Sequence, residues 1–89
     1  MKTDPAKFVC PGGVDFPQAI ELARQIDAGE PNADQLVNEN FSDYVAIEVA
    51  KQIRTGIPDI PRLQELMVSP ELAHAIANAI SDNSKDGTP

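Results

Sequence analysis

Apolar residues in the central part of the chain recur every three or four positions, which is the spacing of an amphipathic helix. The first such run contains five apolar residues at helical spacing: Phe16, Ala19, Ile20, Ala23 and Ile26. Asp15 precedes this run as an N-cap residue, and Gly29 follows it as a residue suited to the left-handed conformation of a helix end. Pro31 prevents the helix from continuing, and Asn32 can cap a second, shorter helix.

The same pattern returns further along the chain. The segment 21–32 is echoed by the segment 48–59, with a glycine and a proline at matching positions. A third copy of the longer helix begins at the same offset with Ser69, which is followed by a first-turn proline and an acidic residue. A fixed period of this kind indicates one small structural unit that is copied along the chain and stacked on its neighbours.

We therefore expect an all-α fold of five short helices, arranged as two helix-turn-helix units of 27-residue period plus a half unit. A single helical domain spans 15–80, and its units are 15–41, 42–68 and 69–80. Small residues at matching positions should let the longer helices pack closely: Ala19, Ala46 and Ala73, then Ala23, Ala50 and Ala77. Ile26, Ile53 and Ile80 should fill the space between these helices.

The two ends of the chain lack this pattern. Residues 1–14 show no helical or strand period, and Cys10-Pro11-Gly12-Gly13 is incompatible with a helix interior. We expect a flexible, extended N-terminal arm whose Phe8 and Val9 could dock on the body. Residues 81–89 are polar and rich in helix breakers, which predicts a disordered tail.

The helix expected at 69–80 is apolar nearly all round, which is typical of a helix buried on every side. Either the other four helices wrap it completely or another chain covers its exposed side. We favour the second arrangement, because four short helices offer little wrapping surface. The predicted protein interface then consists of five apolar residues: Leu66, Met67, Leu72, Ile76 and Ile80. A homodimer is one expected form of this contact.

The composition is acidic, with 14 Asp and Glu residues against seven Lys and Arg residues and a net charge of −7. This balance weighs against nucleic acid as a partner and against anionic membrane surfaces. It fits an ordinary soluble surface with excess charge, or an acidic face that meets a basic partner. No apolar stretch approaches the roughly 20 residues of a membrane helix, so we expect no membrane association and a cytoplasmic protein.

Candidate chemistry is sparse. His74 and Cys10 are the only residues of their types, so the chain has no internal disulfide and no standard zinc ligand set. His74 has no obvious nucleophile to serve, and no base that would activate Cys10 is evident. Gly12-Gly13 lacks the strand and the Gly-Lys-Ser/Thr of a phosphate loop. We expect no catalytic, cofactor-binding or metal-binding residues and no enzyme activity.

One stretch resembles DNA-binding helix-turn-helix proteins. Met67-Val68-Ser69-Pro70-Glu71-Leu72-Ala73 is similar to the Gly-Val-Ser-Pro-Glu-Thr-Val that is common at their turn and recognition helix. The resemblance implies that Ser69 caps a recognition helix. It also implies a set of residues that face the DNA groove: Glu71, Leu72, His74 and Ala75. Met67 replaces the turn glycine, and Arg62 stands where an apolar residue belongs. The helix pairs are also similar to short α-helical repeats of the HEAT or leucine-rich-variant kind, which are mostly binding surfaces.

These observations lead to one main hypothesis and two others. The first is a small acidic, non-enzymatic helical protein that binds another protein as a regulator, inhibitor or adaptor. The second is a DNA-binding transcriptional regulator that uses a helix-turn-helix formed by residues 60–80. The third is an obligate homodimer with a purely structural role. The identity of the partner does not follow from the sequence.

Overall fold

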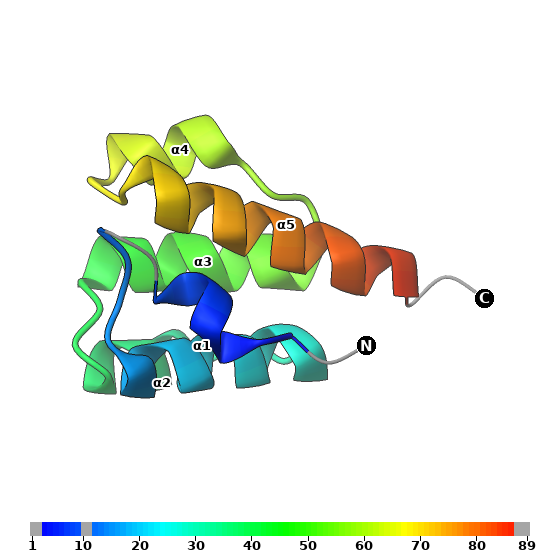
Figure 1. The fold of residues 1–89 in the computed structure, drawn as a ribbon, viewed down its shortest axis with the longest axis horizontal. Coiled ribbons are helices and arrows are strands. Elements are labelled where there is room, and N and C mark those ends of the chain that lie inside the picture. The colour runs from blue at the N-terminus through cyan, green and yellow to red at the C-terminus, as the bar shows by residue number, and fades with distance from the viewer. Residues whose placement is uncertain (1–2, 10–11, 87–89) are drawn as a thin grey trace.

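The computed structural model describes residues 3–9 and 12–86, and within them the chain is all-α (Figure 1). Its elements are the 3-10 helix η1 (Pro5–Phe8) and the α-helices α1 (Phe16–Ala28), α2 (Ala33–Asn38), α3 (Asp43–Thr55), α4 (Ile60–Glu65) and α5 (Pro70–Asp86). The expected class and the five α-helices are confirmed. The short helix η1 was not expected.

The capping residues act as the sequence predicts. Gly29 and Gly56 end α1 and α3 in the left-handed conformation, with φ of 68° and 72°. The side chains of Asn32 and Asp59 accept hydrogen bonds from the amides three residues later, at the starts of α2 and α4. Helices α1 and α3 have 13 residues each, and α2 and α4 have six each. Corresponding helices therefore match in length as well as in their caps.

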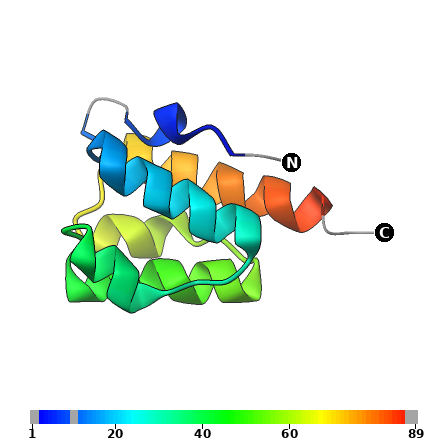
Figure 2. The same cartoon turned by 90° about the horizontal axis from the view of Figure 1, so that it is seen from below.

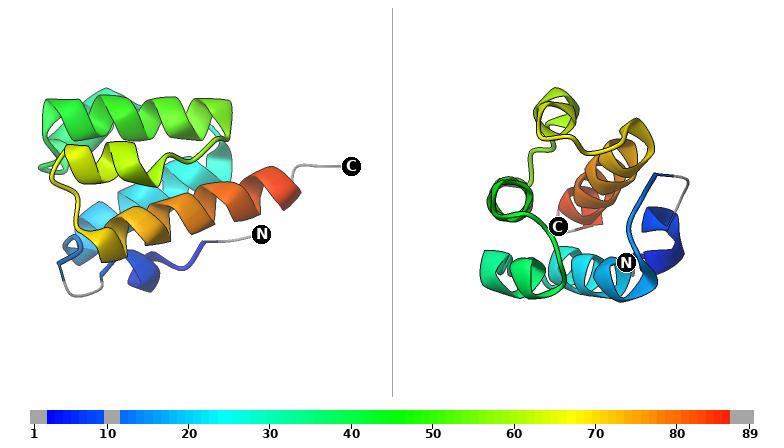
Figure 3. Two further views of the ribbon diagram at one scale, coloured as in Figure 1. Left: turned by 90° about the horizontal axis from the view of Figure 1, so that it is seen from above. Right: turned by 90° about the vertical axis from the view of Figure 1, so that its left-hand side faces the viewer.

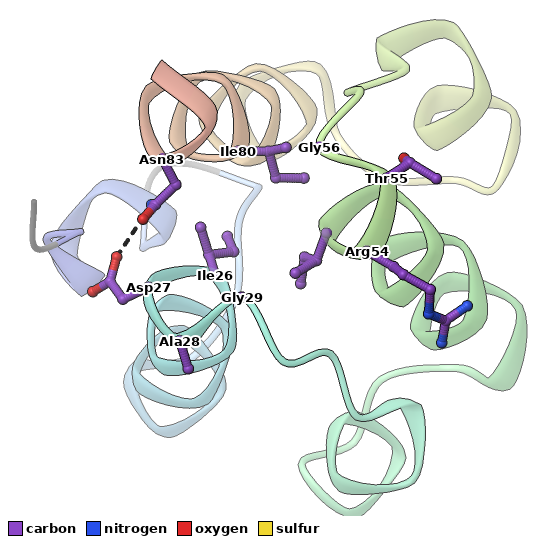
Figure 4. Close-up of a pocket in the computed structure, with 10 residues that line it drawn as sticks. Ile26, Asp27, Ala28, Gly29, Arg54, Thr55, Gly56, Ile80 and Asn83 are labelled. Atoms are coloured by element: carbon purple, nitrogen blue, oxygen red, sulfur yellow. Dashed lines mark hydrogen bonds between the residues drawn. The ribbon is translucent and has the colours of Figure 1, made fainter. Parts of the chain in front are cut away.

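The three long helices α1, α3 and α5 run in the same general direction and enclose the core (Figures 1 and 3). The alanines that the pattern placed at matching positions are all buried: Ala19, Ala46, Ala73, Ala23, Ala50 and Ala77. Ile26, Ile53 and Ile80 are buried too, and all three line one pocket near the C-terminal ends of α1 and α3 (Figure 4). Of the long helices, α1 packs directly against α5, whereas α3 contacts the others mainly through the short helices α2 and α4. The predicted close packing of α1 on α3 and of α3 on α5 is therefore not found.

The short elements bridge the long helices in turn. Helix α2 packs against α1 and α3, and α4 packs against α3 and α5. The 3-10 helix η1 packs against α5 and α1, which completes the series (Figures 2 and 3). The N-terminal segment therefore lies where the third unit, which ends in α5, has no short helix of its own.

The N-terminal segment also repeats the local structure of the other short helices. Each short element carries one fully buried apolar side chain, from Phe8, Leu36 and Leu63 respectively. The backbone carbonyl of that residue accepts a hydrogen bond from a later amide: Val14 to Phe8 (3.0 Å), Phe41 to Leu36 (3.1 Å) and Val68 to Leu63 (3.1 Å). Asp4 caps η1 through its side chain, as Asn32 and Asp59 cap α2 and α4. Residues 3–9 and Val14 thus resemble the other short elements, although η1 is a 3-10 helix, and they close a ring of three long and three short elements.

This closure differs from the extended, flexible arm expected for residues 1–14. Phe8 is 0% exposed, because η1 packs against α1 and α5, whereas Val9 stays 44% exposed. Of the Cys10-Pro11-Gly12-Gly13 stretch, Cys10 and Pro11 lie outside the described residues. Gly12 takes a φ of 79° and approaches Ser69, so that an added Cβ there would lie 3.2 Å from the Ser69 Cβ.

The C-terminal helix also differs from its expected bounds. Helix α5 continues to Asp86, well beyond the predicted end at Ile80. Asn83 accounts for part of this extension, since its side-chain amide donates to the Ala79 carbonyl (3.2 Å) and to Asp27 Oδ1 (3.2 Å). Of the segment predicted as a disordered tail, residues 87–89 lie outside the described part of the chain.

A residue in the left-handed conformation follows each of the helices α2 and α4, and a substitution of Met67 can test its cost. Asn40 and Met67 follow α2 and α4 at matching positions and have φ of 73° and 72°. Asparagine tolerates this conformation, whereas a methionine there is disfavoured by about 1 kcal/mol relative to glycine. Because Met67 is 92% exposed and loses almost no packing, Met67→Gly should raise the free energy of unfolding by about that amount in urea titrations. Asn40→Gly is the control and should change stability by less.

Candidate protein-interaction site

The five predicted interface residues do not form one exposed surface. Leu72, Ile76 and Ile80 are 5%, 0% and 3% exposed and belong to the chain's own core. Leu66 is half-buried against that core, and Met67 alone projects into solvent. We predicted that another chain covers the apolar face of the last long helix, and this burial disagrees with that prediction. The physical reason is that α1, α4 and η1 together cover α5.

Exposed apolar side chains lie elsewhere. The large ones among the described residues are Val9, Phe16, Ile20, Val37, Tyr44, Ile47, Ile57 and Met67. Single exposed apolar residues are normal on a protein surface, but a group that lines a concave surface indicates a contact site. Phe16 and Ile20 lie one helical turn apart on α1 and are 55% and 46% exposed. The sequence pattern included both in the first helix, but it gave no sign that they face outward.

A groove runs between the outer face of α1 and the N-terminal segment. Its volume is about 570 Å³, and its lining residues are Thr3, Pro5, Ile20, Ala23, Arg24, Asp27 and Ala28. The floor and walls are mainly apolar, and Phe16 extends the apolar stripe by one turn toward the start of α1. We call this surface, the lining residues together with Phe16, the α1 groove. Its shape suits a side chain or a helix of another protein better than a small polar ligand.

The charge on Arg24, at the edge of the α1 groove, is balanced within α1. Its guanidinium donates to both carboxylate oxygens of Glu21, at 2.5 and 3.2 Å. Burial alone would raise the pKa of Glu21, but the hydrogen bonds from Arg24 and Gln25 outweigh burial and lower it. Glu21 therefore stays ionised and neutralises the only basic residue of the groove lining.

Asp27 fixes the wall of the α1 groove. Its carboxylate accepts the Thr3 backbone amide (2.9 Å to Oδ2), the Thr3 hydroxyl (2.5 Å to Oδ1) and the Asn83 side-chain amide (Figure 4). These bonds join the N-terminal segment, α1 and α5 at one point. Burial alone would raise the pKa of Asp27, but the hydrogen bonds from Thr3 and Asn83 hold it below its usual range.

The lowered pKa of Asp27 predicts an acid-sensitive contribution to stability. A carboxyl whose folded pKa lies below its unfolded value stabilises the fold above about pH 4, and this contribution is lost as the pH falls toward the folded pKa. We expect Asp27→Asn to lower the free energy of unfolding at neutral pH. In urea titrations between pH 6 and about pH 3, the variant should lose less of its remaining stability on acidification than the wild-type chain loses. An unchanged acid profile in the variant would contradict the role of the network.

A second pocket, of about 300 Å³, opens at the C-terminal ends of α1 and α3 (Figure 4). Ile26, Ile53 and Ile80 form its apolar floor, and the backbone of Gly29 and Gly56 lies at its rim. The Arg54 side chain extends away from Ile26 and Ile80 (Figure 4). Asp27 and Asn83 also line this pocket, but they are hydrogen-bonded to each other (3.2 Å) and belong to the network that holds the N-terminal segment. The pocket therefore contributes less to a functional assignment than the α1 groove.

Two buried polar networks are structural. Gln25 is 1% exposed, donates to Glu21 Oε2 (2.8 Å) and to the Asn32 carbonyl (3.1 Å), and accepts from the Asn32 amide (2.9 Å). Glu48, Gln52 and Asp59 repeat this arrangement in the second unit. Each network ties a long helix to the start of the next short helix. These networks were not predicted from the sequence, although a Glu–Gln pair one helical turn apart recurs at the repeat period.

Of the two residues considered for catalysis, the structure describes only His74. His74 is exposed, and its Nδ1 lies 2.8 Å from the Pro70 carbonyl oxygen. Cys10 lies outside the described residues. Across residues 3–9 and 12–86, no group of three His, Cys, Asp or Glu side chains could hold a metal ion. The helices of the described segments are too short or too polar to cross a membrane.

The helix-turn-helix resemblance is partly reflected in the geometry. Met67 takes the left-handed conformation of the turn glycine that it replaces, and Ser69 Oγ accepts the Leu72 amide (3.2 Å) as an N-cap. Leu72 is buried, so it does not join Glu71 and His74 on the exposed face. Arg62, at the expected apolar position, is half-exposed and lies beside Glu48 and Glu65.

Comparisons with known proteins add no assignment. Neither the protein-family models nor the curated proteins nor the solved structures contain a match to this chain.

Proposed function

We propose that this chain is a small acidic, non-enzymatic helical protein that binds another protein as a regulator, inhibitor or adaptor. The observation that carries the proposal is the α1 groove, an outward-facing apolar surface built from two segments that Asp27 holds together. As part of the proposal we place the protein in the cytoplasm, because its single cysteine allows no internal disulfide.

The proposal moves the contact surface from α5 to α1. Burying an exposed Phe or Ile side chain in an interface contributes roughly 1.5–3 kcal/mol, so Phe16 and Ile20 are the natural contact residues. Both are held on a regular helix, and little ordering is needed before a partner binds. Tyr44 and Ile47 also lie about one helical turn apart, on α3, and are 76% and 62% exposed, but neither lines the α1 groove. The other exposed apolar residues lie singly on other elements.

DNA binding by residues 60–80 remains the second candidate, favoured by the turn geometry at Met67. The surface along α5 weighs against it, since Glu71 and Asp82 line a pocket there with one basic residue, Lys7 of η1. Fluorescence anisotropy with labelled duplex DNA at low salt tests this candidate. Salt-dependent binding that is lost when His74 and Asn78 are replaced by alanine would favour it over the first.

The repeat supplies a matched control for the protein-binding proposal. Ile20 and Ile47 occupy equivalent positions on α1 and α3, and both are exposed, but only Ile20 lines the α1 groove. We expect a protein captured by the wild-type chain, from extracts of the cells that make it, to be captured by Ile47→Asn and lost with Ile20→Asn. A chain that retains no protein above a denatured control would contradict the proposal. Light scattering reports whether the retained partner is a second copy.

A further inference from the structure

We propose that the α1 groove binds a basic amphipathic helix of about three turns from the partner protein. This inference rests on the proposed function and names the chemistry of the partner at that site. It is carried by the dimensions of the groove, by the small side chains in it and by the charge around it.

The dimensions suit a short helix. The apolar stripe from Phe16 to Ala28 follows α1 for about 18 Å, the rise of roughly 12 helical residues. Ala23 and Ala28 are small enough to let a second helix approach the α1 backbone, while Ile20 projects between its side chains. Helix α1 already packs against the short elements η1 and α2, so a further short helix extends the packing that this fold uses.

The charge around the groove specifies a basic partner. The segments that form it, residues 3–5 and 15–30, hold five acidic residues and one basic residue: Asp4, Asp15, Glu21, Asp27 and Glu30, against Arg24. Glu21 already neutralises Arg24. A helix with Leu or Ile on one face and Lys or Arg beside it would bury the first set on Phe16 and Ile20, and its charges would face an acidic rim.

The same charges disfavour a second copy of the chain in the groove. Each copy carries a net charge of −7, and two α1 grooves placed face to face would bring their acidic residues together. Like charges that are brought close together oppose association. We therefore assign the groove to a partner of opposite charge.

Two synthetic peptides of about 14 residues test the inference on the full-length, ¹⁵N-labelled chain. Both carry Leu at positions i, i+3, i+4 and i+7, with lysines on the remaining face in one and glutamates in the other. We expect the lysine peptide to shift amide resonances of residues 16–28 and 3–5, and to bind more weakly as salt increases. The glutamate peptide should not bind. Ile20→Asn should lower the affinity for the lysine peptide by about 30-fold, which is the loss expected for a central contact residue. Ile47→Asn should leave this affinity unchanged.

Asparagine keeps the net charge unchanged, so the two variants separate the apolar contact from general attraction to an acidic protein. Shifts centred on α3 or α5, equal effects of the two variants, or equal binding of the two peptides would overturn the inference. If the amide resonances of residues 16–28 shift when the protein alone is concentrated, without peptide, the groove would be assigned to self-association instead. If no lysine peptide binds while capture of a natural partner still depends on Ile20, the basic-helix inference fails and the proposed function stands. If capture does not depend on Ile20 either, the α1 groove is not the binding site.

Discussion

Replacement of Phe8 by alanine should lower the free energy of unfolding by about 3–5 kcal/mol, the usual cost of truncating a buried phenylalanine. Phe8 is 0% exposed and takes the same place in η1 that Leu36 and Leu63 take in α2 and α4. Since a domain of this size has only about 5–10 kcal/mol of stability, the variant should lose most of its cooperative transition. Urea titration followed by far-ultraviolet circular dichroism measures the effect.

Val9→Ala is the matched control for Phe8→Ala. Val9 is the next residue along the chain and is 44% exposed, so its truncation should cost less than about 1 kcal/mol. Losses of equal, small size in both variants would mean that the N-terminal segment contributes nothing to the fold. Loss of the α1 groove should accompany Phe8→Ala, because Pro5 and Thr3 form part of its wall.

The second large effect is expected from Gln25→Glu, which should cost about 3 kcal/mol at pH 7. The change keeps the shape of the side chain but replaces its amide donor with a carboxylate oxygen. That oxygen would then face Glu21 Oε2 and the Asn32 carbonyl, which now accept hydrogen bonds from Gln25. Gln52→Glu should behave alike, since Gln52 donates to Glu48 Oε2 (2.9 Å) in the same way.

The pH dependence distinguishes this mechanism from a simple packing defect. Two carboxyls that share a buried site raise each other's pKa in the folded state, so protonation of one restores a donor. The loss should therefore be smaller at pH 5 than at pH 7, as judged by urea titration at both values. Gln64→Glu adds the same charge on the exposed face of α4 and should change stability by less than about 0.5 kcal/mol. A Gln25→Glu variant as stable as that control would contradict the network.

The long helices could be predicted because their signals are local. Asp15, Gly29 and Pro31 act within a few residues of their own helix, and their counterparts in the second unit repeat them. The N-terminal short helix escaped prediction because it falls out of register with the period. The spacing from Asp4 to Phe8 equals that from Asn32 to Leu36, but Asp4 stands one position too early for the repeat. One extra residue between the short helix and the next N-cap conceals the third copy.

The location of the exposed apolar surface could not be predicted for a related reason. Ile76 and Ile20 both read as apolar positions of amphipathic helices, and only tertiary packing decides which one is covered. Ile76 is covered because α1, α4 and the N-terminal segment pack against α5, and Ile20 stays 46% exposed at the edge of the N-terminal segment. The buried polar pairs were missed because Glu21 and Gln25 resemble ordinary surface residues until the start of the next helix is placed beside them.

Amide hydrogen exchange at Val14 tests most directly whether the N-terminal segment closes the ring and so forms one wall of the α1 groove. The Val14 amide donates to the Phe8 carbonyl, as Phe41 and Val68 donate to Leu36 and Leu63. We expect Val14 to exchange about as slowly as Phe41 and Val68, because all three bonds break only when a short element leaves the core. Exchange of Val14 at the rate of an unstructured amide, with Phe41 and Val68 protected, would contradict the closed ring.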